Sequence, residues 1–171
     1  SMQISKLLHT IGDFERISDH GVNILKVGKE IYEKNIKFSS QAQHEIAVAT
    51  NALKEIMNIA FEAFDKDDLE LAQKVEPLEQ GIDELIDVMK VNHIKRLKNG
   101  QCTIEHGFVL ADLLNNYERV SDHCSNIGVA LIELSKASFD THEYLNRLKT
   151  IDNDDFLNMF AQFREKYSLE K

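Results

Sequence analysis

The chain contains the stretch Phe14-Glu-Arg-Ile-Ser-Asp-His-Gly-Val-Asn-Ile24 and repeats it, 103 positions later, as Tyr117-Glu-Arg-Val-Ser-Asp-His-Cys-Ser-Asn-Ile127. Seven of the eleven positions are identical: Glu, Arg, Ser, Asp, His, Asn and Ile. A repeated hydrophobic pattern would not by itself reproduce these polar residues. Because solenoid repeats have periods of about 20 to 50 residues, the wider spacing indicates a duplicated structural unit.

The composition favours a helical protein of one domain. The 171 residues include one proline and seven glycines, so helix-breaking residues are rare and helix formers dominate. The length suffices for a core that needs no disulfide or metal to hold it together. The formal net charge of −9 disfavours nucleic acid as a partner and favours cations or basic partners.

Apolar residues at helical spacing predict about four long antiparallel helices, an all-α up-and-down bundle. Ser39 or Ser40 is a suitable N-cap for the second helix, and Asn99-Gly100 is a stop signal for the third. Pro77 is expected to kink or restart the third helix, because proline lacks the amide donor. The predicted ranges are 3–34, 40–64, 69–98 and 103–136.

The remaining residues, 140–171, are predicted to form one or two shorter helices as a C-terminal extension. Phe156, Met159, Phe160 and Phe163 make an apolar stripe there, which we expect to dock onto the bundle. No apolar run of the chain is long enough to span a membrane.

Three predicted helices each carry a Glu and an Asp four residues apart, on one helix face. If the three faces converge, the carboxylates offer oxygen ligands for Mg, Mn or Fe. The ExxH pattern of di-iron bundles is missing at these positions. The alternative is that basic neighbours neutralise the carboxylates as ordinary ion pairs, in a scaffold that binds no metal. The pairs are Glu15 with Asp19, Glu79 with Asp83, and Glu118 with Asp122.

The two copies of Glu-Arg-(Ile/Val)-Ser-Asp-His resemble the repeated metal-binding motif of the PhoU family, whose domains are duplicated three-helix bundles. The stretch His93-Ile-Lys-Arg-Leu-Lys-Asn-Gly-Gln-Cys-Thr is similar to the C-terminal PhoU-like domain of bacterial sodium/phosphate cotransporters. The resemblance covers residues 3–150. It implies that 3–34 is the last helix of a first repeat and that 40–136 is a second repeat.

The resemblance also assigns the acidic pairs to two metal sites. Glu118 and Asp122, with Glu79 and Asp83 on the facing helix, are expected to form one site. The pair formed by Glu15 and Asp19 is expected to belong to another, whose partner helix would precede residue 3. Either that helix has been removed, or an upstream segment or another subunit completes the site.

The function implied by the resemblance is regulation of phosphate uptake by a non-catalytic domain that binds Mg, Mn, Fe or Zn. Its expected partner is the transmembrane part of a sodium-dependent phosphate transporter, at the cytoplasmic face of the inner membrane. Phosphate itself and a second copy of the chain are further candidate partners. A metal-dependent phosphohydrolase or a carboxylate-bridged redox bundle is the alternative.

Four further residues of the repeated stretch allow two interpretations. His20 and His123 follow the motif aspartates about 100° around the helix, so they either support a metal site or form interhelical hydrogen bonds. Arg16 and Arg119 either bind phosphate through their guanidinium groups or pair with neighbouring carboxylates.

Overall fold

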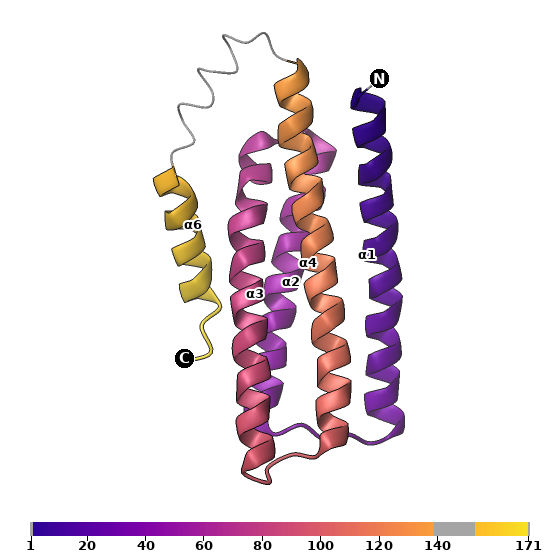
Figure 1. Ribbon diagram of the computed structural model, residues 1–171, viewed down its shortest axis with the longest axis vertical. Coiled ribbons are helices and arrows are strands. Elements are labelled where there is room, and N and C mark those ends of the chain that lie inside the picture. Colours follow the sequence, from indigo (N-terminus) through magenta and orange to yellow (C-terminus); the bar gives the residue numbers. More distant parts are fainter. Residues whose placement is uncertain (1, 139–152, 171) are drawn as a thin grey trace.

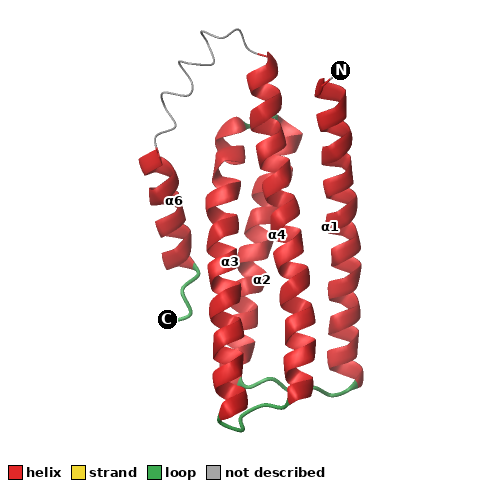
Figure 2. Cartoon of the chain, in the orientation of Figure 1, coloured by secondary structure: helices red, strands yellow, loops and turns green. Residues whose placement is uncertain are grey.

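The computed structural model describes residues 2–138 and 153–170 of the chain, and all regular elements in these ranges are α-helices. Figures 1 and 2 show α1 to α4 running up and down beside one another, joined by short connections, with α6 against the outside of α3. The predicted all-α bundle is therefore confirmed. The helices are α1 (Met2–Glu33), α2 (Ser40–Lys66), α3 (Leu69–Lys98), α4 (Ile104–Ser138) and α6 (Asn153–Lys166).

The helix ends follow from local side-chain chemistry. The Ser39 hydroxyl accepts a hydrogen bond from the Ala42 amide at 3.3 Å and so caps the start of α2. Asp67 has a φ of 52° and ends α2 in the left-handed region. The turn after α3 uses Gly100 with a φ of 68°, a conformation that glycine adopts without strain.

Pro77 lies inside α3, and the helix is continuous through it. The third helix therefore does not restart at the proline. The Pro77 side chain is fully buried, so it contributes packing where it cannot contribute an amide donor.

The hydrophobic core lies between α2, α3 and α4, which form a three-helix bundle. Its largest fully buried apolar side chains are Ile56, Val75, Leu78, Ile82, Ile86, Met89, Leu114, Val120 and Ile127. The fourth long helix, α1, packs chiefly on α4 and reaches α2 through Phe14, whose ring centroid lies 5.2 Å from that of Phe61 and 5.0 Å from that of Phe64.

A buried ion pair joins α2 to α3. Both guanidinium nitrogens of Arg96 donate to the two carboxylate oxygens of Glu45 at 2.9 Å, and Asn92 donates a third hydrogen bond at 2.9 Å. Both charged side chains are almost completely shielded from solvent. Each charge is acceptable inside the protein only because the other is present.

The C-terminal helix α6 docks on α3, as its apolar stripe predicts. Phe163 and Tyr167 pack against the core, and the Tyr167 hydroxyl donates a hydrogen bond to Glu55 of α2. The part of the predicted extension between α4 and α6, residues 139–152, lies outside the described residues.

Candidate metal centre

Three carboxylates from two helices converge between α3 and α4. Glu79 and Asp83 lie one turn apart on α3, and Asp122 lies opposite on α4. One carboxylate oxygen from each side chain lies within 4.8 Å of the other two. Among the residues that the structure describes, these are the only three His, Cys, Asp or Glu side chains that meet in this way.

Close packing of the helices brings these carboxylates together. Gly128 lies on α4 against α3, where a β-carbon would be 3.1 Å from both the Ala72 carbonyl oxygen and the Val75 β-carbon. Glycine therefore permits an approach that a larger residue would hinder. Six residues earlier on α4, about 1.7 helical turns away, Asp122 faces the acidic pair of α3.

The electrostatics of the cluster favour a bound cation. Burial raises the pKa of Glu79 to about 7, and the negative charge of Asp83 adds to the shift. Burial also raises the pKa values of Asp83 and Asp122. For Asp122, the charge of Glu118 acts in the same direction, and that of Arg119 opposes it. Negative charge is thus concentrated where water only partly solvates it. A bound proton or metal ion would reduce the repulsion between the carboxylates.

The donor set also fits a metal. The Oδ1 atom of Asp83 is buried and accepts no hydrogen bond, although an unpaired polar atom in the interior is costly. Carboxylate oxygens are the preferred ligands of Mg²⁺ and Mn²⁺ and are acceptable to Fe and Zn²⁺. An ion held by Glu79, Asp83 and Asp122 would supply the missing partner.

Glu118 lies beside this cluster, but its carboxylate is not one of the three that converge. Its Oε2 atom is 3.3 Å from the Nζ atom of Lys90, with which it forms an ion pair. Both side chains are partly exposed, and such pairs are weak. The charge of Glu118 raises the pKa values of Asp83 and Asp122, so it acts on the cluster electrostatically although its carboxylate does not join it.

The first acidic pair is placed differently. Glu15 and Asp19 are exposed on α1, and neither joins a group of three possible ligands among the described side chains. No described helix covers this face of α1 in the way that α3 covers the corresponding face of α4. The assignment of these two residues to a metal site remains a prediction.

The two histidines of the repeated stretch form reciprocal hydrogen bonds across the α1–α4 interface. The Nδ1 atom of His123 donates to Asp13 at 2.8 Å, and the Nδ1 atom of His20 donates to Asn116 at 2.9 Å. The imidazole rings stack with centroids 5.8 Å apart. Asp13 and Asn116 are also 103 positions apart. The two copies therefore contact each other as equivalent, antiparallel helices.

Sequence reasoning missed the partners of these histidines. Asp13 directly precedes the first copy of the stretch and Asn116 the second, so extending the comparison by one position would have included them. Only the structure shows that each partner belongs to the opposite helix. The positive charge of His123 opposes the rise in the pKa of Asp122, and support of a metal site by the two histidines stays a prediction.

The two motif arginines have different surroundings. Arg119 is exposed on α4, and its charge opposes the rise in the pKa of Asp122. Arg16 lines a cavity between α1 and α4. Neither is in the convergent carboxylate cluster.

Comparison with known proteins identifies the domain. Residues 46–130 match the family model of the PhoU domain, a range that takes in most of α2, all of α3 and most of α4, with the three convergent carboxylates. This part of the chain is a PhoU domain. The PhoU family is associated with the regulation of phosphate transport.

A curated relative supports the same assignment. The chain is 27% identical over 124 residues to the phosphate-specific transport system accessory protein PhoU homolog 1 of Thermotoga maritima. The alignment covers 72% of this chain and 53% of the relative, so the chain spans about half the length of the PhoU protein that it matches. No solved structure gives a significant match. None of the described helices has the length and apolar character needed to cross a bilayer.

Proposed function

We propose that this chain is a non-catalytic, metal-binding regulatory module of a sodium-dependent phosphate transporter. The observation that carries the proposal is the convergence of Glu79, Asp83 and Asp122 in a PhoU domain, with a buried oxygen of Asp83 that has no hydrogen-bond partner. Mg, Mn, Fe or Zn would neutralise these carboxylates. Because the ligands come from α3 and α4, the ion would also fix the spacing of these helices.

The regulated partner is proposed to be the transmembrane part of the transporter, in the same or another polypeptide, with the module at the cytoplasmic face of the inner membrane. Support comes from an exposed apolar face on α1. Three exposed residues of α1 correspond, 103 positions later, to buried residues of α4 that pack in the bundle. The corresponding pairs are Leu7 with Leu110, Ile11 with Leu114, and Leu25 with Gly128.

This α1 face also carries Glu15 and Asp19. A covering helix from the rest of a longer protein, or from a second copy, would bury the apolar residues and provide the acidic pair with facing ligands. Metal binding in the isolated chain is therefore assigned first to the cluster between α3 and α4.

Metal binding is tested on protein stripped with a chelator and then dialysed against Mg²⁺, Mn²⁺, Fe²⁺ or Zn²⁺. Elemental analysis should find at least one of these ions retained at a stoichiometric level, with a higher melting temperature, because a ligand of the folded state stabilises it. Asp122→Asn should abolish both effects. Asp19→Asn, the same change in the other copy, should leave them intact.

Two results would overturn parts of the proposal. If no ion is retained and Asp122→Asn melts like the parent protein in added metal, the carboxylates are not a metal site. If the loaded protein hydrolyses a phosphomonoester above the background of metal alone, the module is an enzyme and the phosphohydrolase alternative replaces the regulatory function.

The transport role needs a separate measurement. Sodium-dependent phosphate uptake would be compared in cells that express the complete transporter with the parent module or with Asp122→Asn. We expect equal amounts of transporter in the membrane and a changed response of uptake to external phosphate. If Asp122→Asn no longer binds metal but the response of uptake to external phosphate is unchanged, the metal site does not take part in regulation.

A further inference from the structure

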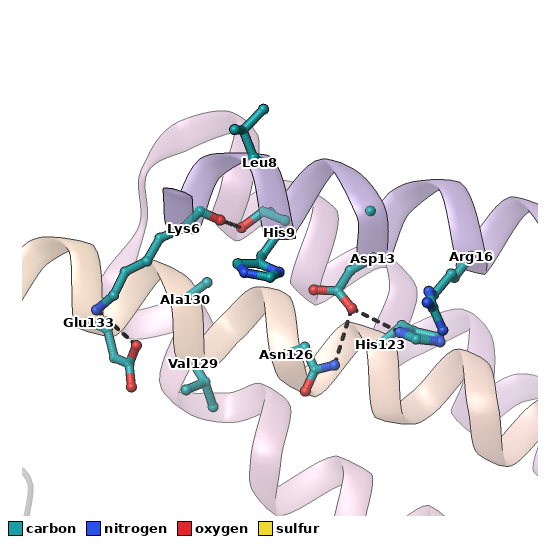
Figure 3. A pocket seen from close by; sticks show the side chains of 12 residues that line it. Lys6, Leu8, His9, Asp13, Arg16, His123, Asn126, Val129, Ala130 and Glu133 are labelled. Carbon is teal, nitrogen blue, oxygen red and sulfur yellow. Dashed lines mark hydrogen bonds and ion pairs between the residues drawn. The ribbon is translucent and has the colours of Figure 1, made fainter. Parts of the chain in front are cut away.

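A cavity of about 510 Å³, open to solvent on one side, lies between the N-terminal half of α1 and the C-terminal half of α4, and His9 and Arg16 are among its exposed lining residues. Figure 3 shows the side chains that line it, with Lys6 and Glu133 at one end, His9 in the middle and Asp13, His123 and Arg16 at the other end. Cavities of this volume hold small molecules. The three convergent carboxylates do not line it.

The duplication provides an internal control for this cavity. Because α1 and α4 are equivalent helices, the interface has a second half in which each position is replaced by its counterpart 103 residues away. There, larger buried side chains stand at the positions of the cavity: Val27 in place of Ala130, and Leu113 in place of Thr10. The buried Val109 replaces Lys6. At these three positions, smaller or polar residues of the cavity take the places that buried apolar side chains hold in the other half.

The hydrogen bonds in the cavity leave cationic and donor groups available. The Asp13 carboxylate already accepts from His123 at 2.8 Å and from Asn126 at 3.1 Å. Glu133 is 2.9 Å from the Nζ atom of Lys6. Both carboxylates are therefore paired.

Arg16 and His9 differ from these carboxylates, because neither has a hydrogen-bond or ion-pair partner among the described residues. In Figure 3 both side chains extend from α1 toward α4. The guanidinium group has five N–H donors in a planar arrangement that matches two oxygens of a phosphate or a carboxylate.

We propose that this cavity binds a small molecule through an oxyanion group, a phosphate or a carboxylate, held by the Arg16 guanidinium. His9 would donate a further hydrogen bond to the oxyanion. Lys6 would leave its ion pair with Glu133 and place its positive charge near the ligand. A metal cation is disfavoured, since Lys6 and Arg16 stand at the two ends and Asp13 is occupied. The volume leaves room for an organic body beside the oxyanion.

Binding would be measured by isothermal titration calorimetry on chelator-treated protein, so that no ion in the carboxylate cluster can recruit the anion. The probes are inorganic phosphate, glycerol phosphate and succinate, which separate free phosphate, a phosphomonoester and a carboxylate. We expect at least one to bind, with an affinity that falls as salt is added.

Matched variants locate the site. Arg16→Gln should weaken binding at least about tenfold, as expected for loss of a charge-assisted pair. Arg119→Gln makes the same change at the equivalent position of the other half and should leave the affinity unchanged. Ala130→Leu should block binding by filling the cavity, and circular dichroism would confirm that each variant is folded.

The proposal is overturned if none of the probes binds at about 10 mM, a concentration that would detect even a weak site. It is also overturned if Arg119→Gln weakens binding as much as Arg16→Gln, or if folded Ala130→Leu binds like the parent. Asp122→Asn should retain anion binding, so failure of the metal proposal and failure of this one are distinguishable.

Discussion

At the scale of single residues, the carboxylate cluster brings the pKa of Glu79 into the neutral range. Its pKa is raised from 4.5 to about 7, first by burial and then by the charge of Asp83. Between these pH values the folded state binds a proton that the unfolded state has released. The free energy of unfolding of the metal-free protein therefore has a contribution that is complete below pH 4.5 and is lost as the pH rises through about 7.

Urea unfolding of chelator-treated protein at several pH values across this window should show the loss. Glu79→Gln, which cannot ionise, should flatten the dependence. Saturating Mn²⁺ or another retained ion should reverse it, because the metal binds the deprotonated carboxylates and competes with the proton. Stability that rises with pH in the metal-free protein would contradict the assignment of this shift to Glu79.

The buried ion pair between Glu45 and Arg96 allows a prediction about stability. Glu45→Ala leaves the Arg96 charge without its partner in a buried place, so unfolding should become easier by about 3–5 kcal/mol. The control is Glu33→Ala, which removes an exposed ion pair with Lys29 and should cost less than about 1 kcal/mol. Urea denaturation of both variants provides the comparison, and equal losses would contradict the predicted effect of burial.

At the scale of helices, the duplication lets the same substitution be made in two environments. Leu114 on α4 is 1% exposed, and its counterpart Ile11 on α1 is 60% exposed. Leu114→Ala should destabilise the protein by about 2–5 kcal/mol through lost burial and a new cavity. Ile11→Ala should change stability by less than about 0.5 kcal/mol in the isolated chain.

Ile11→Ala and Leu114→Ala also show whether the apolar face of α1 is exposed in solution. If Ile11→Ala proves as costly as Leu114→Ala, that face is already covered in solution, for example by a second copy. Measuring the molar mass in solution alongside the unfolding curves would separate this outcome from an error in the assigned exposure.

The approach of α3 to α4 leads to a prediction about glycine. Gly128→Ala places a methyl group 3.1 Å from both the backbone oxygen of Ala72 and the β-carbon of Val75, so α3 must shift slightly at a point one turn before Glu79. Gly28→Ala meets no atom within 4 Å and should stabilise its helix by about 0.5–1 kcal/mol. We expect Gly128→Ala to be less stable than Gly28→Ala by about 1–3 kcal/mol and to bind metal more weakly.

Calorimetry and urea denaturation of the two glycine variants would check this. Equal stability together with unchanged metal affinity would show that α3 and α4 tolerate the added methyl group, and that their spacing does not limit the site.

Much of the helical framework is predictable because it depends on local chemistry. The third helix runs from Leu69 to Lys98 as predicted, since Asp68 caps its start and Asn99-Gly100 follows its end. It is harder to predict which side chains come together in the site. Spacing places Glu118 and Asp122 on one face of a helix, but it does not show that Glu118 pairs with Lys90 on a facing helix while Asp122 meets Glu79 and Asp83. Such contacts depend on the relative rotation of helices, which periodicity alone does not specify.

At the scale of the whole molecule, the structure has one complete three-helix bundle and one helix that stands outside it. The bundle of α2, α3 and α4 contains the PhoU match and the carboxylate cluster. The outer helix α1 repeats the motif of α4 without a described helix against its acidic face. The two copies are therefore expected to bind metal unequally in the isolated chain, which the paired variants Asp122→Asn and Asp19→Asn measure.

The reciprocal hydrogen bonds of His20 and His123 give the contact between α1 and α4 an approximate two-fold symmetry. In a contact between identical partners, each side gives and receives the same interaction, which is the property of an isologous dimer. The α1–α4 interface retains this property within one chain, even though Asp13 and Asn116 now differ. The contact is therefore arranged as the interface of a two-fold symmetric dimer would be, but its two halves have different sequences. One half is filled by the buried side chains of Val27, Val109 and Leu113, and the other half forms the cavity.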